Sequence, residues 1–439
     1  MARDNGSAHV PTPPVRRNVE EECRGVACTR MNQERIMGTP VRRRAGGGSA
    51  AQRAAVGIVT TVLAAGVCTV PAAGATAPRV PAAFAATSAT TCADTVYAGM
   101  TQAQRVGQLF MGGVAATRPS TTDLQTLHTY HVGSVMLTGR SSAGTTATRK
   151  VVDGVRAQAD TVGGHKVGLL VSTDQEGGQV QVLSGPGFSV IPNALTQGSW
   201  STATLRSRAE TWAGQLKAAG LDLNLAPVAD VVPASLGTRN APIGHFYREY
   251  GHTPAVVTSH TGAFAAGFRT AGVMTTFKHF PGLGQVIGNT DTTANVVDSV
   301  TTTTSSSLQP FQSGIKADAP FVMISSAKYT KIDSRHLAAF SPAVINTLLR
   351  GKFGFKGVVI SDDLGQAVAV RAYTPAQRAV QFIGAGGDMV LTVRASTVPA
   401  MVQGVQAQMA KDATFRTKVA ASVHRVLAAK AAAGRLTCG

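Results

Sequence analysis

The feature that most constrains the fold of this chain is an alternation of short apolar runs with longer helical stretches. Eight runs rich in branched apolar residues follow one another, at 108–114, 132–137, 167–173, 221–226, 272–277, 320–325, 357–361 and 388–392. Helical patterns lie between them, as at 201–219, 254–270, 341–352 and 375–385. Near-continuous apolar strands separated by helices indicate a parallel sheet covered by helices. Eight such units predict a single-domain (β/α)8 TIM-type barrel, with a doubly wound open sheet as the alternative.

The charge of the chain does not indicate a nucleic-acid-binding protein. The formal net charge is +18, of which residues 1–91 contribute +6 through 11 Arg and 5 acidic residues. The remaining +12, from 30 basic and 18 acidic residues, is spread along helical segments and is not interleaved with aromatic residues. We therefore expect no nucleic-acid partner. A basic surface instead suits an anionic environment such as a cell wall.

Residues 1–91 have the order of a leader, a secretory signal and a linker. A cluster of three arginines at 42–44 precedes an apolar run at 54–70, and an Ala/Thr/Pro stretch at 78–91 follows. This order is typical of an export signal, and the run is marginal for a permanent membrane span. We expect a secreted, extracellular monomer, able to associate with the cell wall, whose folded domain occupies residues 92–439.

Two cysteines remain once the export segment is set aside, one at each end of the folded part. They are Cys92 and Cys438. In an oxidising compartment a Cys92–Cys438 disulfide would join the two ends of the domain and close a very long loop. Two unrelated free thiols are the alternative.

Polar side chains follow four of the predicted strands. The third strand ends in Asp174-Gln175-Glu176-Gly177-Gly178, the fourth leads to Asp230, the fifth ends in Lys278-His279, and the seventh in Asp362-Asp363. Each segment alone could be a solvated turn or a cap. In a barrel, however, the carboxyl ends of all strands meet at one face, where active sites lie. The four segments together therefore predict a catalytic site.

These segments resemble the signatures of the glycoside hydrolase family 3 N-terminal catalytic domain, and they occur in the family's order. The matching segments are Asp-Gln-Glu-Gly-Gly at 174–178, Leu-Ala-Pro-Val-Ala-Asp at 225–230, Lys-His-Phe-Pro-Gly at 278–282 and Gly-Val-Val-Ile-Ser-Asp-Asp-Leu at 357–364. The resemblance covers roughly residues 95–435. It implies a barrel enzyme that hydrolyses β-linked sugars without a cofactor or metal.

The resemblance also implies roles for individual residues. Asp362 matches the family's nucleophile, a carboxylate that forms a covalent glycosyl-enzyme which water hydrolyses with retention. Lys278, His279 and Asp174 would hydrogen-bond the hydroxyls of the terminal sugar. Arg248 matches a sugar-binding arginine, and pairing with Glu249 or another surface acid is its alternative role. We interpret Asp363 as a neighbour that caps or hydrogen-bonds the loop.

The chain departs from the family at the general acid/base. Single-domain members with N-acetylhexosaminidase activity usually carry a His after Lys-His-Phe-Pro-Gly and an Asp-Ser-His a few residues later. Here Leu283 stands in the first position and Asn289-Thr290-Asp291 in the second. The imidazole that would protonate the leaving group is therefore absent from this motif.

Three hypotheses follow from the missing histidine. Asp291 is itself the acid/base, which restores the two-carboxylate arrangement of most retaining glycosidases and requires a raised pKa. Alternatively, the acid comes from another loop, with His245, His252 and His336 as candidates. In the third hypothesis turnover is lost and the protein only binds sugar. We prefer the first.

The sequence therefore predicts a secreted, retaining exo-β-glycosidase. By resemblance to single-domain members, its substrate is a terminal β-linked N-acetylglucosaminide in an oligosaccharide or cell-wall fragment. A β-glucosidase or β-xylosidase of the same family is the enzymatic alternative, and a catalytically weak wall-binding protein is the alternative outside enzymology.

Overall fold

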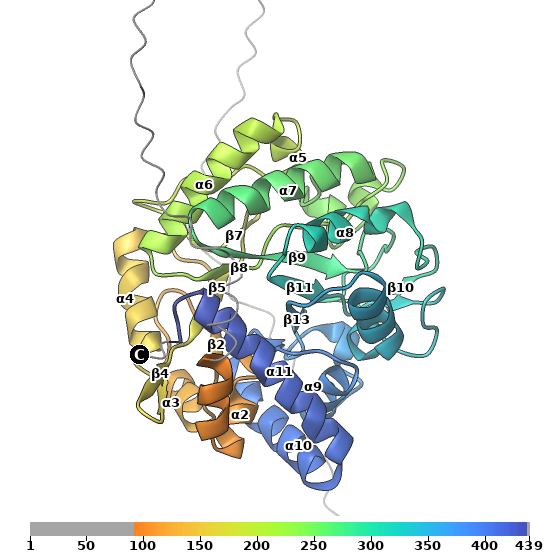
Figure 1. Ribbon diagram of the computed structural model, residues 1–439. Coiled ribbons are helices and arrows are strands. Elements are labelled where there is room, and N and C mark those ends of the chain that lie inside the picture. Colours follow the sequence, from red (N-terminus) through yellow and green to blue (C-terminus); the bar gives the residue numbers. More distant parts are fainter. Residues whose placement is uncertain (1–91, 437–439) are drawn as a thin grey trace, which may run out of the picture. The chain divides into compact units, whose positions relative to one another are not determined.

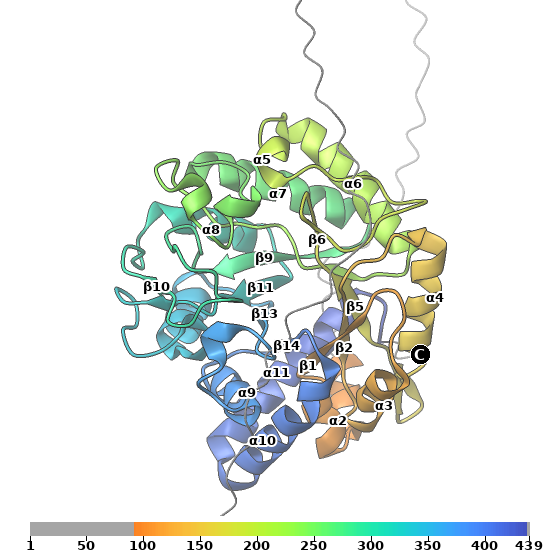
Figure 2. The same cartoon turned by 180° about the vertical axis from the view of Figure 1, so that it is seen from behind.

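The computed structural model describes residues 92–436, in which the eight predicted strands form one parallel sheet (Figures 1 and 2). The sheet order is β13-β11-β9-β8-β5-β2-β1-β14. The strands are β1 (Phe110–Ala115), β2 (Ser134–Thr138), β5 (Leu170–Thr173), β8 (Leu223–Asn224), β9 (Met274–Phe280), β11 (Phe321–Ile324), β13 (Val358–Ser361) and β14 (Val390–Thr392). A parallel bridge between Ile360 and Met389 joins the two outer strands. The predicted barrel is confirmed, and the alternative prediction of a doubly wound open sheet is wrong.

Helices cover the outside of this barrel. They are α2 (Gln102–Gly107), α3 (Thr121–Thr129), α4 (Gly144–Arg156), α5 (Ala194–Gln197), α6 (Thr202–Ala218), α7 (Pro254–Thr270), α8 (Gln309–Lys316), α9 (Pro375–Gly384), α10 (Val398–Lys411) and α11 (Ala413–Ala432). Their starts follow from capping residues: Ser201 caps α6 and Thr253, followed by Pro254, caps α7. The predicted helix at 341–352 is a π-helix, Ala343–Lys352.

The third predicted strand is shorter than expected. Val167 belongs to a separate hairpin of β3 (Asp160–Val162) and β4 (His165–Val167), and β5 begins only at Leu170. Gly163 and Gly164 form the turn of this hairpin with φ of 55° and 82°, a conformation that glycine adopts without steric cost. The predicted apolar run is interrupted at Gly168. The N–H of Gly168 donates a hydrogen bond to the carbonyl of Arg435, which lies outside the barrel sheet.

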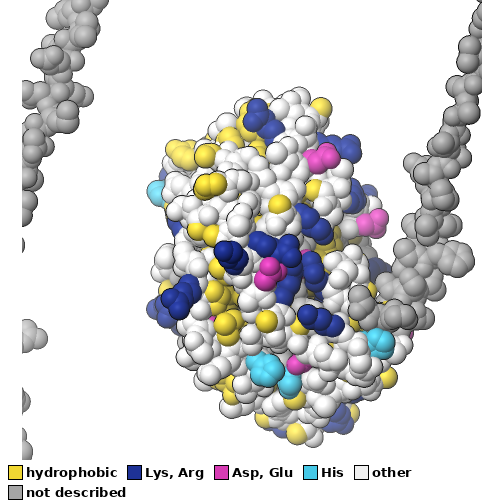
Figure 3. Space-filling model, turned by 90° about the vertical axis from the view of Figure 1, so that its left-hand side faces the viewer, with side chains coloured by type: hydrophobic (Ala, Val, Ile, Leu, Met, Phe, Trp, Pro, Cys, Tyr) yellow, Lys and Arg dark blue, Asp and Glu magenta, His cyan; other side chains and the backbone are white. Residues whose placement is uncertain are grey.

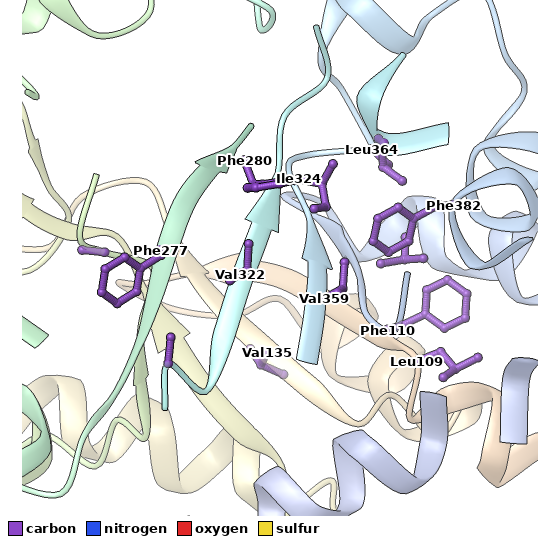
Figure 4. Close-up of a cluster of buried hydrophobic side chains, with 14 of the residues drawn as sticks. Leu109, Phe110, Val135, Phe277, Phe280, Val322, Ile324, Val359, Leu364 and Phe382 are labelled. Atoms are coloured by element: carbon purple, nitrogen blue, oxygen red, sulfur yellow. The ribbon is translucent and has the colours of Figure 1, made fainter. Parts of the chain in front are cut away.

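The strands are buried on both faces because one face lines the barrel and the other packs against helices. On β11, Phe321 and Met323 belong to one cluster of buried side chains, while Val322 and Ile324 belong to the other. Figure 4 shows members of the outer cluster on neighbouring strands. Such two-sided burial explains why the strands read as continuous apolar runs without alternation.

Some of the sequence predictions concern residues outside the described part of the chain. These are the leader, signal and linker at 1–91 and the second cysteine of the predicted Cys92–Cys438 pair, Cys438. Cys92 itself is described and begins a helical segment at 92–99. The disulfide and the export signal therefore stay predictions. Within 92–436, no helix is long and apolar enough to cross a membrane.

The last helix carries a buried lysine. Lys430 on α11 is fully buried, and its ammonium group donates to Oε1 of Gln108. Burial lowers its pKa from 10.5 to about 7, although Asp160 and Asp222 oppose the effect. Since the pKa is lower in the folded state than in the unfolded chain, the unfolded state binds more protons between about pH 7 and pH 10, and stability rises with pH across this window.

Replacing Lys430 by methionine is expected to stabilise the domain at pH 6. We expect a gain of about 1–3 kcal/mol in the free energy of unfolding, because a buried charge is removed while Gln108 loses one partner. The gain should shrink as the pH rises from about 7 to 10. Urea unfolding of both proteins at pH 6 and pH 9 measures it, and an advantage that is independent of pH would contradict the explanation.

Candidate active site

A cavity of about 600 Å³ lies where the carboxyl ends of the strands meet. Its walls are formed by residues that follow the strands, including Asp174 after β5, Lys278 and His279 at the end of β9, and Asp362 after β13. The loops contribute Arg248 and Asp291. All six catalytic and substrate-binding candidates from the sequence therefore line one cavity.

Two cations and two carboxylates form a linked series of ion pairs at one side of this cavity. The ammonium group of Lys278 lies 2.7 Å from Asp174 Oδ1 and 2.6 Å from Glu176 Oε1. Arg248 holds Glu176 through two bonds, from Nε at 2.8 Å and from Nη2 at 2.7 Å. Its Nη1 donates to the carbonyl of Pro242 at 2.8 Å. A bidentate ion pair of this kind fixes the orientation of the guanidinium plane.

The charges of this network are stabilised by one another. Burial would raise the pKa of Glu176, but Arg248 and Lys278 outweigh it and hold the pKa at about 2. Burial would likewise lower the pKa of Lys278, but Asp174 and Glu176 raise it above its usual value. Glu176 is 4% exposed at the side chain and Asp174 22%, so Asp174 is the carboxylate of the pair that a ligand can reach.

A buried aspartate orients His279. Asp230 Oδ2 lies 2.8 Å from His279 Nδ1, and Oδ1 accepts hydrogen bonds from the backbone N–H groups of His279 and Leu283. Asp230 is fully buried, and His279 is 4% exposed. With Nδ1 committed to the carboxylate, Nε2 is the ring nitrogen left to face a ligand in the cavity.

The two adjacent carboxylates after β13 have different surroundings. Asp363 accepts four backbone N–H bonds: Oδ1 accepts from Gly365 and Val393, and Oδ2 accepts from Gln366 and Ala367. Within residues 92–436 the carboxylate of Asp362 accepts one hydrogen bond, from the N–H of Asp363 at 2.8 Å, and it lines the cavity. Asp363 thus holds the loop, as expected, and Asp362 is the carboxylate with oxygen atoms available for chemistry.

The loop that carries Asp291 is attached to the segment that follows Asp363. The N–H groups of Val368 and Ala369 donate to the carbonyls of Asp291 and Thr290, at 3.1 and 3.0 Å. Burial within the cavity wall raises the pKa of Asp291 to about 6, and the charge of Asp362 adds to the effect. Arg248 and His279 oppose the rise. At pH 6 about half of the Asp291 side chains would therefore carry a proton.

The three alternative histidines do not line the cavity. His336 lies beside Asp333, with Nδ1 2.9 Å from Oδ2, and its side chain is 45% exposed. His252 Nδ1 lies 3.0 Å from the carbonyl of Val232, and His245 packs edge-on against Phe246. Among the described residues, the histidine in the cavity wall is His279, which Asp230 already engages.

Two functional residues were not selected from the sequence, although both stand in the quoted motifs. Glu176 is the centre of the cation network, and Asp230 orients His279. The alternative pairing of Arg248 with Glu249 is wrong, because Arg248 binds Glu176. The available signal was the position of both carboxylates in the segments that follow β5 and β8, within the motifs already quoted.

Comparisons with known proteins identify the family of the chain. The Glycosyl hydrolase family 3 N terminal domain matches residues 101–429. The chain belongs to glycosyl hydrolase family 3. A beta-hexosaminidase of Xanthomonas axonopodis pv. citri (strain 306) is 32% identical over 311 residues, which are 69% of this chain and 89% of that protein.

Solved structures of family 3 proteins share the barrel. The β-N-acetylhexosaminidase from Beutenbergia cavernae DSM 12333 is 50% identical, with a TM-score of 0.73 over 75% of this chain and 98% of that one. A family 3 β-N-acetylglucosaminidase from Paenibacillus sp. str. FPU-7 is 28% identical, with a TM-score of 0.68 over 76% of this chain and 63% of that one. The family and the fold expected from the sequence are thereby confirmed.

Proposed function

We propose that this family 3 glycoside hydrolase is a secreted, retaining exo-enzyme that removes terminal β-linked N-acetylglucosamine. The observation that carries the proposal is the pairing of Asp362 with Asp291 in one cavity, beside a network of charged groups suited to sugar hydroxyls. The solved structures named above as a β-N-acetylhexosaminidase and a β-N-acetylglucosaminidase support the choice of sugar. Export rests on the order of residues 1–91 alone.

The geometry suits a double-displacement reaction. Asp362 attacks the anomeric carbon while protonated Asp291 gives its proton to the glycosidic oxygen, and the aglycone departs. The product is a glycosyl ester of Asp362 and an ionised Asp291. Asp291 then takes a proton from water, which attacks the anomeric carbon and releases Asp362 with net retention.

The pKa of Asp291 fits both halves of this cycle. A carboxyl group with a pKa of about 6 is a sufficiently strong acid to protonate a departing oxygen and, once ionised, a sufficiently strong base to deprotonate water. Asp362 contributes to that pKa through its negative charge. When Asp362 is esterified this charge disappears, so the pKa of Asp291 falls and the group becomes the ionised base that the second step needs.

The remaining network would bind the terminal sugar. Asp174 is half-buried at the cavity wall and Lys278 lies directly behind it, so a vicinal pair of hydroxyls can contact both a carboxylate and an ammonium group. Arg248 supplies a further donor, and the Nε2 atom of His279 a further hydrogen-bonding atom. Charge-assisted hydrogen bonds of this kind hold the ring in position for attack.

A panel of 4-nitrophenyl β-glycosides tests the proposal. The protein should release nitrophenol from the β-N-acetylglucosaminide in preference to the β-glucoside and β-xyloside. Release of nitrophenol from the β-glucoside alone or from the β-xyloside alone would show that the enzyme acts on that sugar and not on N-acetylglucosamine. Binding of N-acetylglucosamine without turnover of any glycoside would show a sugar-binding protein on an enzyme's scaffold and overturn the proposed activity.

Asp363 is expected to act on catalysis through Asp291. The carboxylate of Asp363 accepts hydrogen bonds from the N–H groups of residues 365–367. The next two residues, 368 and 369, donate their N–H groups to the carbonyls of residues 291 and 290. In Asp363→Asn an amide NH₂ group replaces one acceptor oxygen, so this hydrogen-bonded arrangement loosens. We expect kcat for an unactivated glycoside to fall by about 10–100-fold, as for a misplaced catalytic group.

A comparison of leaving groups separates positioning from a general loss of structure. Asp363→Asn should lose less rate on an aryl glycoside with an easily departing phenol, since that substrate needs little protonation. Equal losses on both classes of substrate would show that Asp363 affects the whole site and not the acid.

A further inference from the structure

A second pocket lies at the opposite end of the barrel from the catalytic cavity. It has a volume of about 140 Å³, and the described residues that line it are Arg156, Lys166, Gly168, Gly434 and Arg435. Gly168 comes just before β5, so the pocket lies at the amino-terminal ends of the parallel strands. Three of its five lining residues are cations, and none is aromatic or apolar apart from the glycines.

The positive charge of this pocket is only partly neutralised. Asp222, whose side chain is fully buried, lies 3.0 Å from Arg156 Nη2 and 2.8 Å from Arg435 Nε. Lys166 is exposed, and no carboxylate within 92–436 forms an ion pair with it. Among residues 92–436, three cations thus face one carboxylate at this pocket, which gives these four side chains a charge of about +2.

The two arginines have donors to spare. Arg435 uses Nε on Asp222, and Arg156 uses Nη2 on Asp222 and on the carbonyl of Gly220. Nε of Arg156 is buried and has no hydrogen-bond partner among the described residues. A guanidinium group carries five N–H donors, so several in this cluster are without an acceptor. The ion pairs with Asp222 account for the position of the arginines but not for Lys166.

The surroundings add further positive charge. Burial lowers the pKa of Arg156, and repulsion by Arg435 and Arg149 lowers it further. Arg149, on α4, is itself paired with Asp153 at 2.8 Å. On the side of the molecule that Figure 3 shows, where α4 lies in Figure 1, Lys and Arg side chains gather with few carboxylates among them.

We propose that this pocket is a binding site for a phosphate group. A small tetrahedral dianion matches the volume of the pocket, the uncompensated charge of about +2 and the donors that reach it from α4, β4 and the segment after α11. Arg435 and Arg156 would donate from one wall and Lys166 from the other. The site is separate from the glycosidase chemistry, so binding and turnover should be independent.

Isothermal titration of the full domain with inorganic phosphate, at constant ionic strength, tests the proposal. We expect saturable binding of one phosphate per chain and at least about fivefold weaker binding in Lys166→Gln, which removes a charged donor that no buried group depends on. Lys411→Gln is the matched control, because Lys411 ends α10, is exposed and does not line the pocket. It should bind phosphate as the wild type does.

Two further probes distinguish the sources of such a group. Binding of inorganic phosphate and glycerol 3-phosphate, but not of dimethyl phosphate, indicates a free or terminal phosphate. Binding of dimethyl phosphate as well indicates the backbone of a phosphodiester polymer. Absence of saturable phosphate binding, or equal weakening in Lys166→Gln and Lys411→Gln, overturns the site. Turnover of an aryl glycoside should be unchanged in Lys166→Gln and serves as the measure of correct folding.

Discussion

Replacing Asp362 by alanine is expected to lower kcat for every glycoside by at least about 10⁴-fold, the loss typical of removing a covalent nucleophile. Asp362 lines the cavity and accepts one backbone N–H, whereas its neighbour Asp363 has all its accepting capacity directed at the loop. The variant should fold normally, because no buried donor other than the N–H of Asp363 loses its partner. Steady-state kinetics and thermal unfolding measured on the same preparation would show both effects.

Chemical rescue provides the control for Asp362→Ala. Azide can enter the space left by the carboxylate and attack the anomeric carbon of an activated aryl glycoside, which forms a glycosyl azide and releases the phenol. The azide product should have inverted configuration, since a single displacement replaces two. A variant that retains more than about a hundredth of wild-type kcat without azide would show that Asp362 is not the nucleophile.

The sequence predicted the barrel because its strands are buried on both faces. Such strands appear as uninterrupted apolar runs, and all eight were found at or within a few residues of their positions in the structure. Features that depend on single residues were missed. The β3–β4 hairpin requires Gly163 and Gly164 at positive φ, and the division of the third run depends on a hydrogen bond from Gly168 to Arg435, far along the chain.

The site was predictable to the extent that catalytic groups follow strand ends. That rule located Asp174, Lys278, His279 and Asp362, which the structure brings to one cavity. The rule could not predict which residues form ion pairs, because that depends on which loops the folded barrel brings together. Arg248 binds Glu176, which is 72 residues away, although Glu249 is adjacent. Glu249 is buried elsewhere, where burial raises its pKa.

The structure also explains how an aspartate could act as the acid in place of the histidine that the family resemblance led us to expect. A histidine has a pKa near neutrality without help, whereas an aspartate must be shifted upward to hold a proton there. The cavity wall and the nearby Asp362 supply this shift and bring the pKa of Asp291 to about 6. The two carboxylates are therefore one functional unit, since the charge of Asp362 helps to set the protonation state of Asp291.

Replacing Asp291 by alanine should slow the reaction by an amount that depends on how easily the leaving group departs. For an unactivated glycoside we expect kcat/KM to fall by about 10²–10⁴-fold, the usual contribution of a general acid. For an aryl glycoside with a readily departing phenol, the first step should proceed almost normally while the second, which needs a base, becomes slow. The glycosyl ester of Asp362 should then accumulate as a burst of phenol and as an added sugar mass on the intact protein.

The pH dependence gives an independent test of the same residue. Because Asp291 must be protonated in the first step, wild-type kcat/KM for an unactivated glycoside should fall about tenfold per pH unit above its pKa of about 6. Asp291→Asn has no titratable group at this position, so its kcat/KM should not show this fall at alkaline pH. Below pH 6 its kcat/KM should be lower than that of the wild type. If the limb persists in Asp291→Asn, another group supplies the proton, and His279 becomes the first to examine, because it is the histidine of the cavity wall.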